Sequence, residues 1–265
     1  MFVLGVNRAY LYAHPELALN PEEQTRYDEV IAQRATGMPS QYITGHQEFW
    51  GLDFVVTPAV LIPRPETEHL VETVLELVRE SGEPTAGLKI VDVGTGSGCV
   101  ALALANELPF AQVYATDISI EALEIAKANA ARLQLDDRVQ FLHADVMEPK
   151  SSEREMLRGL DFVVSNPPYV AYSEADKVQK SVKEFEPQQA VFAGMDGLDV
   201  ISRIVEQAQA ALKPGGWIAV EIGYSMRDRV LGLLDPALWD DVRVVPDLQG
   251  IPRVVAARKR SDSGS

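Results

Sequence analysis

The sequence predicts an α/β fold, in which helices cover a seven-stranded mixed sheet whose last strand is antiparallel. From about residue 87 onward, short apolar runs alternate with segments of helical period, which is typical of right-handed βαβ winding. The last two apolar runs are joined by residues 246–252, which are too few for a crossover helix, so these strands should pair antiparallel. The predicted strands are 89–93, 112–116, 138–142, 161–165, 217–222, 241–245 and 253–257, with helices over 67–81, 100–108, 119–133 and 199–212.

A smaller region precedes this α/β part of the chain. Residues 1–40 are expected to be helical, because Pro21 suits the first turn of a helix whose N-cap is Asn20. In residues 41–66, two aromatic and β-branched runs flank a glycine-containing turn, which indicates a β-hairpin. The expected parts are a small helical N-terminal segment (1–40), a β-hairpin linker (41–66), the main domain (67–258) and a disordered tail (259–265).

The amino-acid composition indicates which kinds of substrate the protein can bind and in which cellular compartment it works. The 265 residues carry a formal net charge of −15, which would repel a nucleic-acid backbone, so a protein or small-molecule substrate is favoured. The single cysteine, Cys99, excludes an internal disulfide and fits a reducing compartment. The histidines lack metal-ligand spacing, so no metal site is predicted. Without a run of membrane-span length or a signal peptide, we expect a cytoplasmic monomer that does not bind membranes.

The stretch Asn166-Pro167-Pro168-Tyr169 directly follows a predicted strand. The carboxyl end of a strand is where open α/β sheets bind ligands, and the two prolines stiffen the turn. The Asn166 amide oxygen and the Pro167 carbonyl are two acceptors that can hold both hydrogens of one planar NH2 group, and Tyr169 adds a flat ring. The competing interpretation is an ordinary strand followed by a proline-rich turn.

A glycine-rich turn separates the first strand of the main domain from its helix: Gly94-Thr95-Gly96-Ser97-Gly98. The G-x-G-x-x-G fingerprint of nicotinamide dinucleotide sites would need a glycine where Cys99 stands. Asp92 precedes the turn, and its carboxylate would oppose a pyrophosphate but suit a cation. S-adenosyl-L-methionine carries an ammonium and a sulfonium and no phosphate, so it is the cofactor that these residues favour.

Acidic residues follow the next two strands. Asp117 ends the second strand about 20 residues beyond the glycines, where a carboxylate can bind ribose hydroxyls. Asp145 follows the third strand and could accept from an adenine amino group, while Val146 could pack on the ring. Capping of the following helix is a competing role for Asp117, and Asp145 could equally be a solvated loop residue.

Two charged residues, Arg64 and Glu66, lie between prolines just before the helix predicted over 67–81. Either they form an exposed salt bridge ahead of that helix, or they bind substrate as a clamp near the active site. Spacing alone does not decide between these two roles.

Taken together, these motifs resemble those class I methyltransferases that modify planar nitrogens with S-adenosylmethionine and have a Rossmann-like fold. Further blocks strongly resemble the release factor glutamine methyltransferase family, and the resemblance runs from about residue 40 to residue 257. These blocks are Tyr42-Ile43-Thr44-Gly45, Glu48-Phe49-Trp50-Gly51-Leu52, Leu61-Ile62-Pro63-Arg64-Pro65-Glu66-Thr67-Glu68, Glu186-Pro187, Gly194 to Leu198, and Glu221-Ile222-Gly223.

The resemblance implies methylation of the glutamine N5 in the Gly-Gly-Gln motif of class 1 peptide chain release factors, with S-adenosylhomocysteine as the second product. Asn166, Pro167 and Tyr169 would be catalytic and would bind substrate together with Pro168, and Asn166 would also border the cofactor. The family's helical N-terminal domain helps to hold the release factor. This chain starts inside what resembles a family helix, so we expect a truncated domain or a misassigned start.

Three other functions stay open at this point. A related enzyme could methylate a glutamine of a ribosomal protein and hold its side-chain amide with the same two acceptors. An amino methyltransferase acting on nucleic acid is a further alternative, although the net charge weighs against it. The last alternative is a cofactor-binding module without activity. Such a module would not need two acceptors for a substrate amide beside the cofactor.

Overall fold

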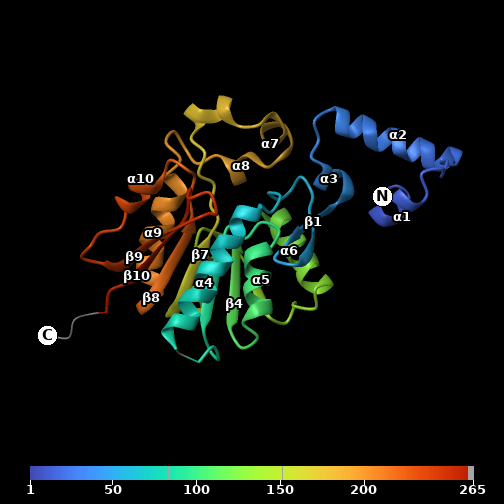
Figure 1. The fold of residues 1–265 in the computed structure, drawn as a ribbon. Helices are drawn as coiled ribbons and strands as arrows, with labels where there is room; N and C mark the ends of the chain where they lie inside the picture. The colour runs from blue at the N-terminus through green and yellow to red at the C-terminus, as the bar shows by residue number, and fades with distance from the viewer. Residues whose placement is uncertain (83, 151, 262–265) are drawn as a thin grey trace.

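A central eight-stranded sheet organises the protein, with the strand order β6-β5-β4-β3-β7-β8-β10-β9 (Figure 1). The computed structural model describes residues 1–82, 84–150 and 152–261, so the end of the predicted tail, 262–265, lies outside the described residues. The strands are β3 (Lys89–Val93), β4 (Gln112–Asp117), β5 (Val139–Asp145), β6 (Glu148–Pro149), β7 (Leu160–Ser165), β8 (Leu212–Glu221), β9 (Trp239–Pro246) and β10 (Pro252–Lys259).

Strand pairing confirms the predicted topology. Strands β5, β4, β3, β7 and β8 run parallel, and β10 is antiparallel to both β8 and β9. The seven predicted strands are therefore all present, and the two-residue β6 adds a short antiparallel partner to the end of β5. One boundary differs from expectation, because β8 begins at Leu212 and includes Pro214-Gly215-Gly216, with a register shift opposite β7. Lys259, expected in the tail, ends β10.

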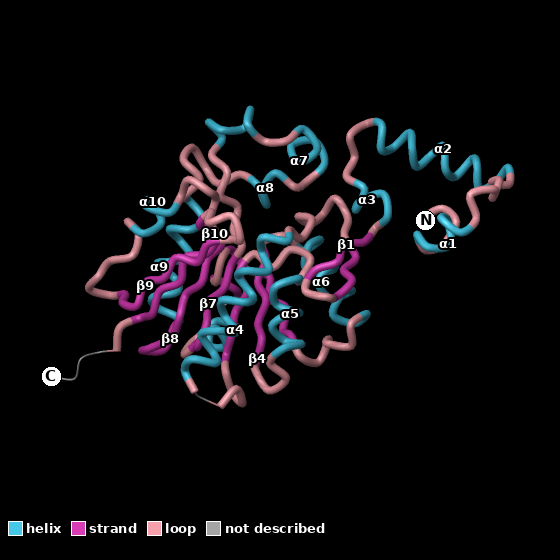
Figure 2. The backbone as a smooth tube through the Cα atoms, viewed as in Figure 1, coloured by secondary structure: helices cyan, strands magenta, loops and turns pink. Residues whose placement is uncertain are grey.

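Helices cover both faces of the sheet (Figure 2). They are α1 (Arg8–Ala13), α2 (Pro21–Ala35), α3 (Ser40–Thr44), α4 (Glu68–Ser81), α5 (Cys99–Glu107), α6 (Ile120–Arg132), α7 (Lys180–Phe185), α8 (Gln188–Val191), α9 (Asp199–Ala211) and α10 (Arg227–Leu231), with 3-10 turns η1 (Pro65–Thr67), η2 (Arg154–Leu157) and η3 (Tyr172–Lys177). Within the described part of the chain, none of the helices is long and apolar enough to cross a membrane.

Side-chain alternation along the strands builds two apolar layers. On β7, Phe162 and Val164 face the layer that contains α4 and α5. Val163 faces the opposite layer, which contains α9 and α10. Because both faces of the parallel strands are covered, the strands read as nearly continuous apolar runs. This packing holds the carboxyl ends of the strands at one edge of the sheet.

The N-terminal helices lie to one side of the sheet (Figure 1). Helix α2 begins as predicted: Asn20 accepts from the Glu23 N–H at 2.8 Å, and the Glu23 carboxylate accepts from the Asn20 N–H at 2.9 Å. None of the residues in α1, α2 and α3 is fully buried, and Tyr27 and Ile31 on α2 are 44% and 47% exposed. These helices therefore add little to the apolar core.

The predicted hairpin is formed by β1 (His46–Phe49) and β2 (Leu52–Val55). Phe49 and Phe54 are buried against the layer of α4 and α5, with their ring centroids 6.2 Å apart. The hairpin thus belongs to the core of the main domain, although it directly follows the exposed N-terminal helices.

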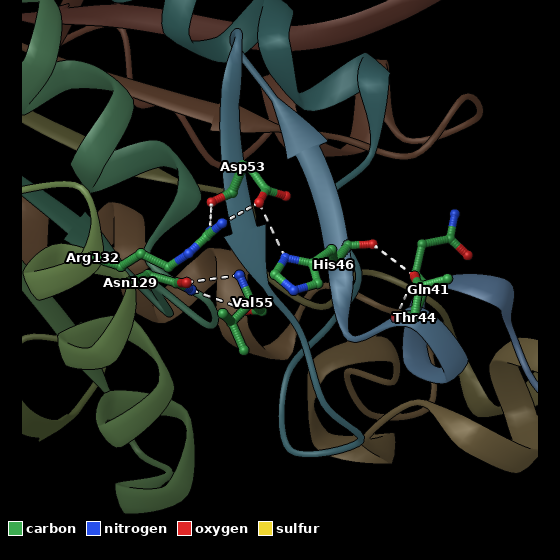
Figure 3. Close-up of polar contacts among 7 residues, drawn as sticks. All are labelled: Gln41, Thr44, His46, Asp53, Val55, Asn129 and Arg132. Atoms are coloured by element: carbon green, nitrogen blue, oxygen red, sulfur yellow. Dashed lines mark hydrogen bonds and ion pairs between the residues drawn. The ribbon is translucent and has the colours of Figure 1, made fainter. Parts of the chain in front are cut away.

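Polar contacts hold β2 against α6 (Figure 3). The Asn129 side chain accepts from the Val55 N–H at 2.7 Å and donates to the Val55 carbonyl at 3.0 Å. It also donates to the Ser97 carbonyl in the glycine turn at 2.9 Å. Arg132, on the same helix, forms an ion pair with Asp53. One buried asparagine therefore connects the hairpin, α6 and the glycine turn.

Replacing Asn129 with alanine should lower the free energy of unfolding by about 2–3 kcal/mol, because buried backbone groups lose their partner. Asn129 is fully buried. The matched control is Arg132→Ala, which removes an ion pair whose side chains are 41% and 50% exposed and should cost less than about 1 kcal/mol. Urea unfolding followed by tryptophan fluorescence measures both. Equal losses would contradict this role for Asn129.

Candidate active site

The carboxyl ends of β3, β4, β5 and β7 border one pocket of about 360 Å³. Its size is in the range of small-molecule sites, and it lies at the edge where open α/β sheets bind ligands. The pocket brings together the glycine turn, the acidic strand ends and the proline-rich turn. The predicted residues in its lining are Asp92, Gly94, Thr95, Gly96, Ser97, Asp117, Asp145, Val146, Asn166, Pro167 and Pro168.

The glycine turn folds back onto the end of β4. The N–H groups of Gly94 and Thr95 both donate to the Thr116 carbonyl at 2.9 Å. Gly96 has a φ of 55°, in the left-handed region that favours glycine. Its N–H donates to Asp117 Oδ2 at 2.9 Å. The turn therefore has a fixed shape, set by hydrogen bonds to β4.

Gly98 lies outside the pocket lining and serves helix packing. A Cβ at this position would lie 3.1 Å from Leu102 Cδ1 and 3.2 Å from Ala126 Cβ. Glycine therefore permits the start of α5 to approach α6 closely. The predicted cofactor contact of Gly98 stays a prediction.

Asp92 is a buried carboxylate beneath the turn, 1% exposed. Its Oδ2 accepts from the Thr95 hydroxyl at 2.6 Å and from the Ala101 N–H at 3.2 Å. Burial raises the pKa of Asp92 to about 7 although these hydrogen bonds lower it, and the charge of Asp117 raises it further. A cation bound beside Asp92 would favour its ionised form.

Asp117 ends β4 with both carboxylate oxygens engaged by backbone groups. Oδ2 accepts from Gly96 and Oδ1 accepts from the Ser119 N–H, each at 2.9 Å. Helix α6 is capped by Ser119, whose hydroxyl accepts from the Ala122 N–H at 3.1 Å, so the capping role considered for Asp117 is wrong. Burial raises the pKa of Asp117. Each oxygen has a further lone pair that can accept from a hydroxyl group.

Asp145 and Val146 form the far wall of the pocket, where the chain turns from β5 into β6. Val146 is buried with a φ of 58°, and its carbonyl accepts from the Thr116 hydroxyl at 2.8 Å. The Asp145 carboxylate pairs with Arg203 on α9 at 2.8 Å, and both side chains are about half exposed. Asp145 is therefore a rim residue with a charged partner.

Asn166 follows β7, whose last residue, Ser165, donates its hydroxyl to the Val93 carbonyl at 2.7 Å. The side-chain Nδ2 of Asn166 donates to the Thr67 hydroxyl at 3.0 Å. Within the described part of the chain, no internal hydrogen bond uses the Asn166 amide oxygen or the Pro167 carbonyl as acceptor. The two acceptors expected from the sequence therefore both keep their lone pairs available in the pocket.

Thr67 is a site residue that sequence reasoning did not single out. It lines the pocket and is 1% exposed. Thr67 belongs to the Pro63-to-Glu68 block, but a single threonine beside the charged residues Arg64 and Glu66 has no pattern that indicates a site.

Tyr169, Arg64 and Glu66 line a different, polar pocket of about 500 Å³. Burial raises the pKa of the Tyr169 phenol. Arg64 pairs with Glu186, whose side chain is 1% exposed and also accepts from the Ile62 N–H at 3.2 Å. The pair is therefore not the exposed salt bridge considered from the sequence. It fastens the linker to the segment that follows α7.

The chemistry of the first pocket suits a cationic ligand without phosphate groups. Asp92, Asp117 and Asp145 line it, and Arg203 is the one basic residue among its described lining residues, already paired with Asp145. These residues fit S-adenosylmethionine, whose charged groups are an ammonium, a carboxylate and a sulfonium. Among the residues that the structure describes, no group of three or more side chains could hold a metal ion.

The sheet topology and this pocket define a class I S-adenosylmethionine-dependent methyltransferase. Residues 68–185 match the methyltransferase small domain, and residues 1–45 match the PrmC N-terminal domain. The chain belongs to the release factor glutamine methyltransferase family. It is 55% identical to the member from Koribacter versatilis, across 98% of this chain and 88% of that protein, and 42% identical to the one from Geobacter sulfurreducens, across 96% and 85%.

Solved structures show the same fold at low sequence identity. The catalytic domain of hMettl16, solved with a MAT2A 3'UTR hairpin, aligns with a TM-score of 0.63 and 18% identity, covering 98% of this chain and 95% of that one. The 16S rRNA N2 G1207 methyltransferase RsmC of T. thermophilus aligns with a TM-score of 0.56 and 21% identity, covering 81% and 50%. The fold is thus shared by enzymes with other substrates, and the chemistry must come from the site.

Proposed function

We propose that this protein transfers the methyl group of S-adenosylmethionine to the N5 amide nitrogen of the glutamine in the Gly-Gly-Gln motif of class 1 peptide chain release factors. Family membership supports the substrate. The observation that carries the chemistry is the contact of Asn166 Nδ2 with Thr67, because it leaves the amide oxygen as an acceptor beside the Pro167 carbonyl. Translation termination takes place in the cytoplasm, which is where we place this activity.

The turn 166–169 compensates for the weak nucleophilicity of the glutamine amide nitrogen. The lone pair of an amide nitrogen is delocalised into its carbonyl. Asn166 and Pro167 each accept one N–H of the glutamine amide, which aligns the nitrogen and stabilises the positive charge that develops on it. Alignment of this kind can supply about 7–11 kcal/mol of a barrier.

The cofactor supplies an electrophilic methyl group on its sulfonium and leaves as S-adenosylhomocysteine. As the nitrogen–carbon bond forms and the sulfur–carbon bond breaks, the amide nitrogen becomes acidic. It loses its proton to solvent, so the site needs no strong general base. This agrees with a turn that offers acceptors and an aromatic ring rather than an ionisable base.

For the cofactor, we assign each acidic residue to a different part of the molecule. Asp92 and the glycine turn 94–98 face the amino-acid end, where the ammonium and the sulfonium are the cationic groups. Asp117, with lone pairs left on both oxygens, accepts from the ribose hydroxyls. Asp145 and Val146 border the adenine. The order of these residues along the sheet edge, from β3 to β4 to β5, supports this assignment.

The second pocket is where we place the polypeptide next to the substrate glutamine. Consecutive chain segments border both pockets: Pro63 and Thr67 line the first, and Arg64 and Glu66 line the second. Tyr169 lies on the second side, so its ring would pack against the glutamine amide from there. Arg34, Pro39 and Ser40 of the N-terminal segment also line this pocket, together with Gln41 at the start of the linker.

Binding of S-adenosylmethionine should strengthen by about tenfold between about pH 6 and about pH 8, because Asp92, with its pKa raised to about 7, must ionise beside the cation. Below the raised pKa the carboxyl group is protonated, so cofactor binding releases a proton. Titration calorimetry in buffers of different ionisation enthalpy measures both effects. Asp92→Asn should bind more weakly and lose most of the pH dependence. An unchanged pH dependence in this variant would contradict the role given to Asp92.

Mass spectrometry tests the proposed function directly. A class 1 release factor incubated with the protein and S-adenosylmethionine should gain one methyl group on the Gly-Gly-Gln glutamine. An unmodified release factor would refute the proposal if transfer from labelled S-adenosylmethionine went instead to ribosomal protein or nucleic acid. A form of the protein lengthened at its N-terminus, tested in parallel, separates a docking defect from a wrong substrate.

A further inference from the structure

Residues 173–190, between the turn 166–169 and α9, lie outside the two apolar layers of the sheet (Figure 1). Helix α7 buries no residue, and α8 buries only Val191 at its end. Among the described residues, Glu186 is the one member of segment 173–190 that hydrogen-bonds or ion-pairs with chain outside residues 170–195. The position of this segment therefore depends mainly on Glu186.

The Glu186 carboxylate contacts the linker at two points. Its Oε2 accepts from the Ile62 N–H at 3.2 Å, and its Oε1 pairs with the guanidinium of Arg64. The side chain of Glu186 is 1% exposed and that of Arg64 is 33% exposed. A carboxylate this deeply buried is costly unless it is both paired and hydrogen-bonded. Moving the segment away from the linker would remove both partners, so the two stretches of chain stay together.

The stretches that Glu186 joins also separate the two pockets. Three stretches of chain place neighbouring residues on opposite sides, and we call residues 63–67, 168–169 and 186–187 the dividing wall. On the side of the first pocket lie Pro63, Thr67, Pro168 and Pro187, and on the side of the second lie Arg64, Glu66, Tyr169 and Glu186.

We propose that Glu186 is a positioning residue for methyl transfer: through Arg64 and the Ile62 N–H it holds segment 173–190 against the linker and so fixes the dividing wall. This inference rests on the proposed function, which places the polypeptide in the second pocket and the glutamine amide in the first. The glutamine side chain must then cross the wall to reach the methyl group. A displacement of about 1 Å in groups that position a substrate can cost about 10²-fold in rate.

The first test compares two buried carboxylates with the same kind of partners. Glu186→Gln should lower kcat by about 10–100-fold and leave the Kd for S-adenosylmethionine close to the wild-type value. The matched control is Asp161→Asn at the opposite end of β7, where Asp161 pairs with Lys213 at 2.5 Å and accepts from the Lys89 N–H at 2.7 Å. Both substitutions should lower stability in urea, but Asp161→Asn should keep wild-type turnover. Equal turnover in the two variants would overturn the proposal.

A double-mutant cycle tests whether Glu186 acts through Arg64. Arg64→Met removes the guanidinium and retains most of the length of the side chain. If the two residues act as one unit, the variant with both substitutions should lose about as much turnover as the more damaging single substitution. Additive losses would mean that Arg64 serves the substrate independently of Glu186, which would overturn the proposed route through Arg64.

Limited proteolysis tests the anchoring of the segment without any substrate. Trypsin can cut after Lys177 and Lys180, whose side chains are 70% and 79% exposed. Cleavage there should be about tenfold faster in Glu186→Gln and in Arg64→Met, because the open form of the segment is more populated. Asp161→Asn should keep the wild-type rate. Fragment masses identify the sites.

The two kinds of measurement separate this inference from the proposed function. Cleavage at the wild-type rate in both Glu186→Gln and Arg64→Met would overturn the anchoring role, even if the wild-type protein methylates a release factor. If the wild-type protein leaves the release factor unmodified, the proposed function fails, whereas faster cleavage in the two variants would still support the anchoring of segment 173–190.

Discussion

Asn166→Ala should lower kcat for release factor methylation by about 10²–10³-fold, the usual cost of removing one preorganised group that stabilises developing charge. In the proposed mechanism the Asn166 oxygen accepts an N–H whose nitrogen becomes positive during transfer. That interaction is stronger in the transition state than in the ground state, so its loss should appear in kcat. The Pro167 carbonyl is a backbone group and survives the substitution, which keeps the loss below complete inactivation. Single-turnover methylation with labelled S-adenosylmethionine measures the rate.

Cofactor binding distinguishes this role from a general disturbance of the pocket. The Kd of Asn166→Ala for S-adenosylmethionine should stay close to the wild-type value, because the cofactor contacts that we propose lie on the glycine turn and the acidic strand ends. Asn106→Ala is the matched control: it removes the same amide from an exposed position in the last turn of α5 and should leave turnover unchanged. If Asn166→Ala kept more than about a tenth of wild-type turnover, this would contradict the mechanism in which Asn166 accepts an N–H of the substrate amide.

The strands and the first pocket could be read from the sequence because local patterns determine them. Strand β7 is buried on both faces and ends at Ser165, directly before Asn166, so its length, its burial and the position of its carboxyl end all follow from one stretch. The glycine turn and Asp117 follow their strands in the same way. Parallel strands in a wound sheet bring such ends together, so residues distant in sequence could be placed at one site from the sequence alone.

The segment between β7 and α9 could not be read in this way. Its short helices α7 and α8 bury few residues, and their positions depend on distant backbone contacts such as the Val170 N–H to the Val191 carbonyl at 3.0 Å. The contact of Asn166 with Thr67 was hidden for a related reason. No local pattern connects these two residues, which lie far apart in the sequence and meet only in the folded chain.

Gly197 shows how a motif that is noticeable but unexplained in the sequence acquires a physical role. It belongs to the Gly194-to-Leu198 block and is buried against the backbone that directly follows the Asn166 turn. A Cβ at Gly197 would lie 2.3 Å from the Tyr169 carbonyl oxygen, and the residue has a φ of 80°. Both the missing side chain and the left-handed backbone are therefore required, and the constraint reaches the turn 166–169 through Tyr169.

Gly197→Ala should consequently impair both stability and activity. The left-handed backbone costs about 1–2 kcal/mol for alanine, and relief of the overlap with the Tyr169 peptide should cost about 1–3 kcal/mol more. Because relief requires the Tyr169 peptide to move, kcat/KM for the release factor should fall by about 10²-fold, as expected when catalytic groups shift by about 1 Å. Urea unfolding and methylation assays at a temperature where the variant stays folded measure the two losses separately.

The exposed Gly250 provides the control that separates backbone strain from steric overlap. Its φ is also 80°, but a Cβ there would meet nothing within 4 Å. Gly250→Ala should therefore show only the left-handed penalty of about 1–2 kcal/mol and retain wild-type turnover. If Gly197→Ala resembled Gly250→Ala in both measurements, the contact with Tyr169 would have no effect on the catalytic turn. A larger loss at Gly197, in turnover as well as stability, would show that this loop supports the turn to which we assign the substrate amide.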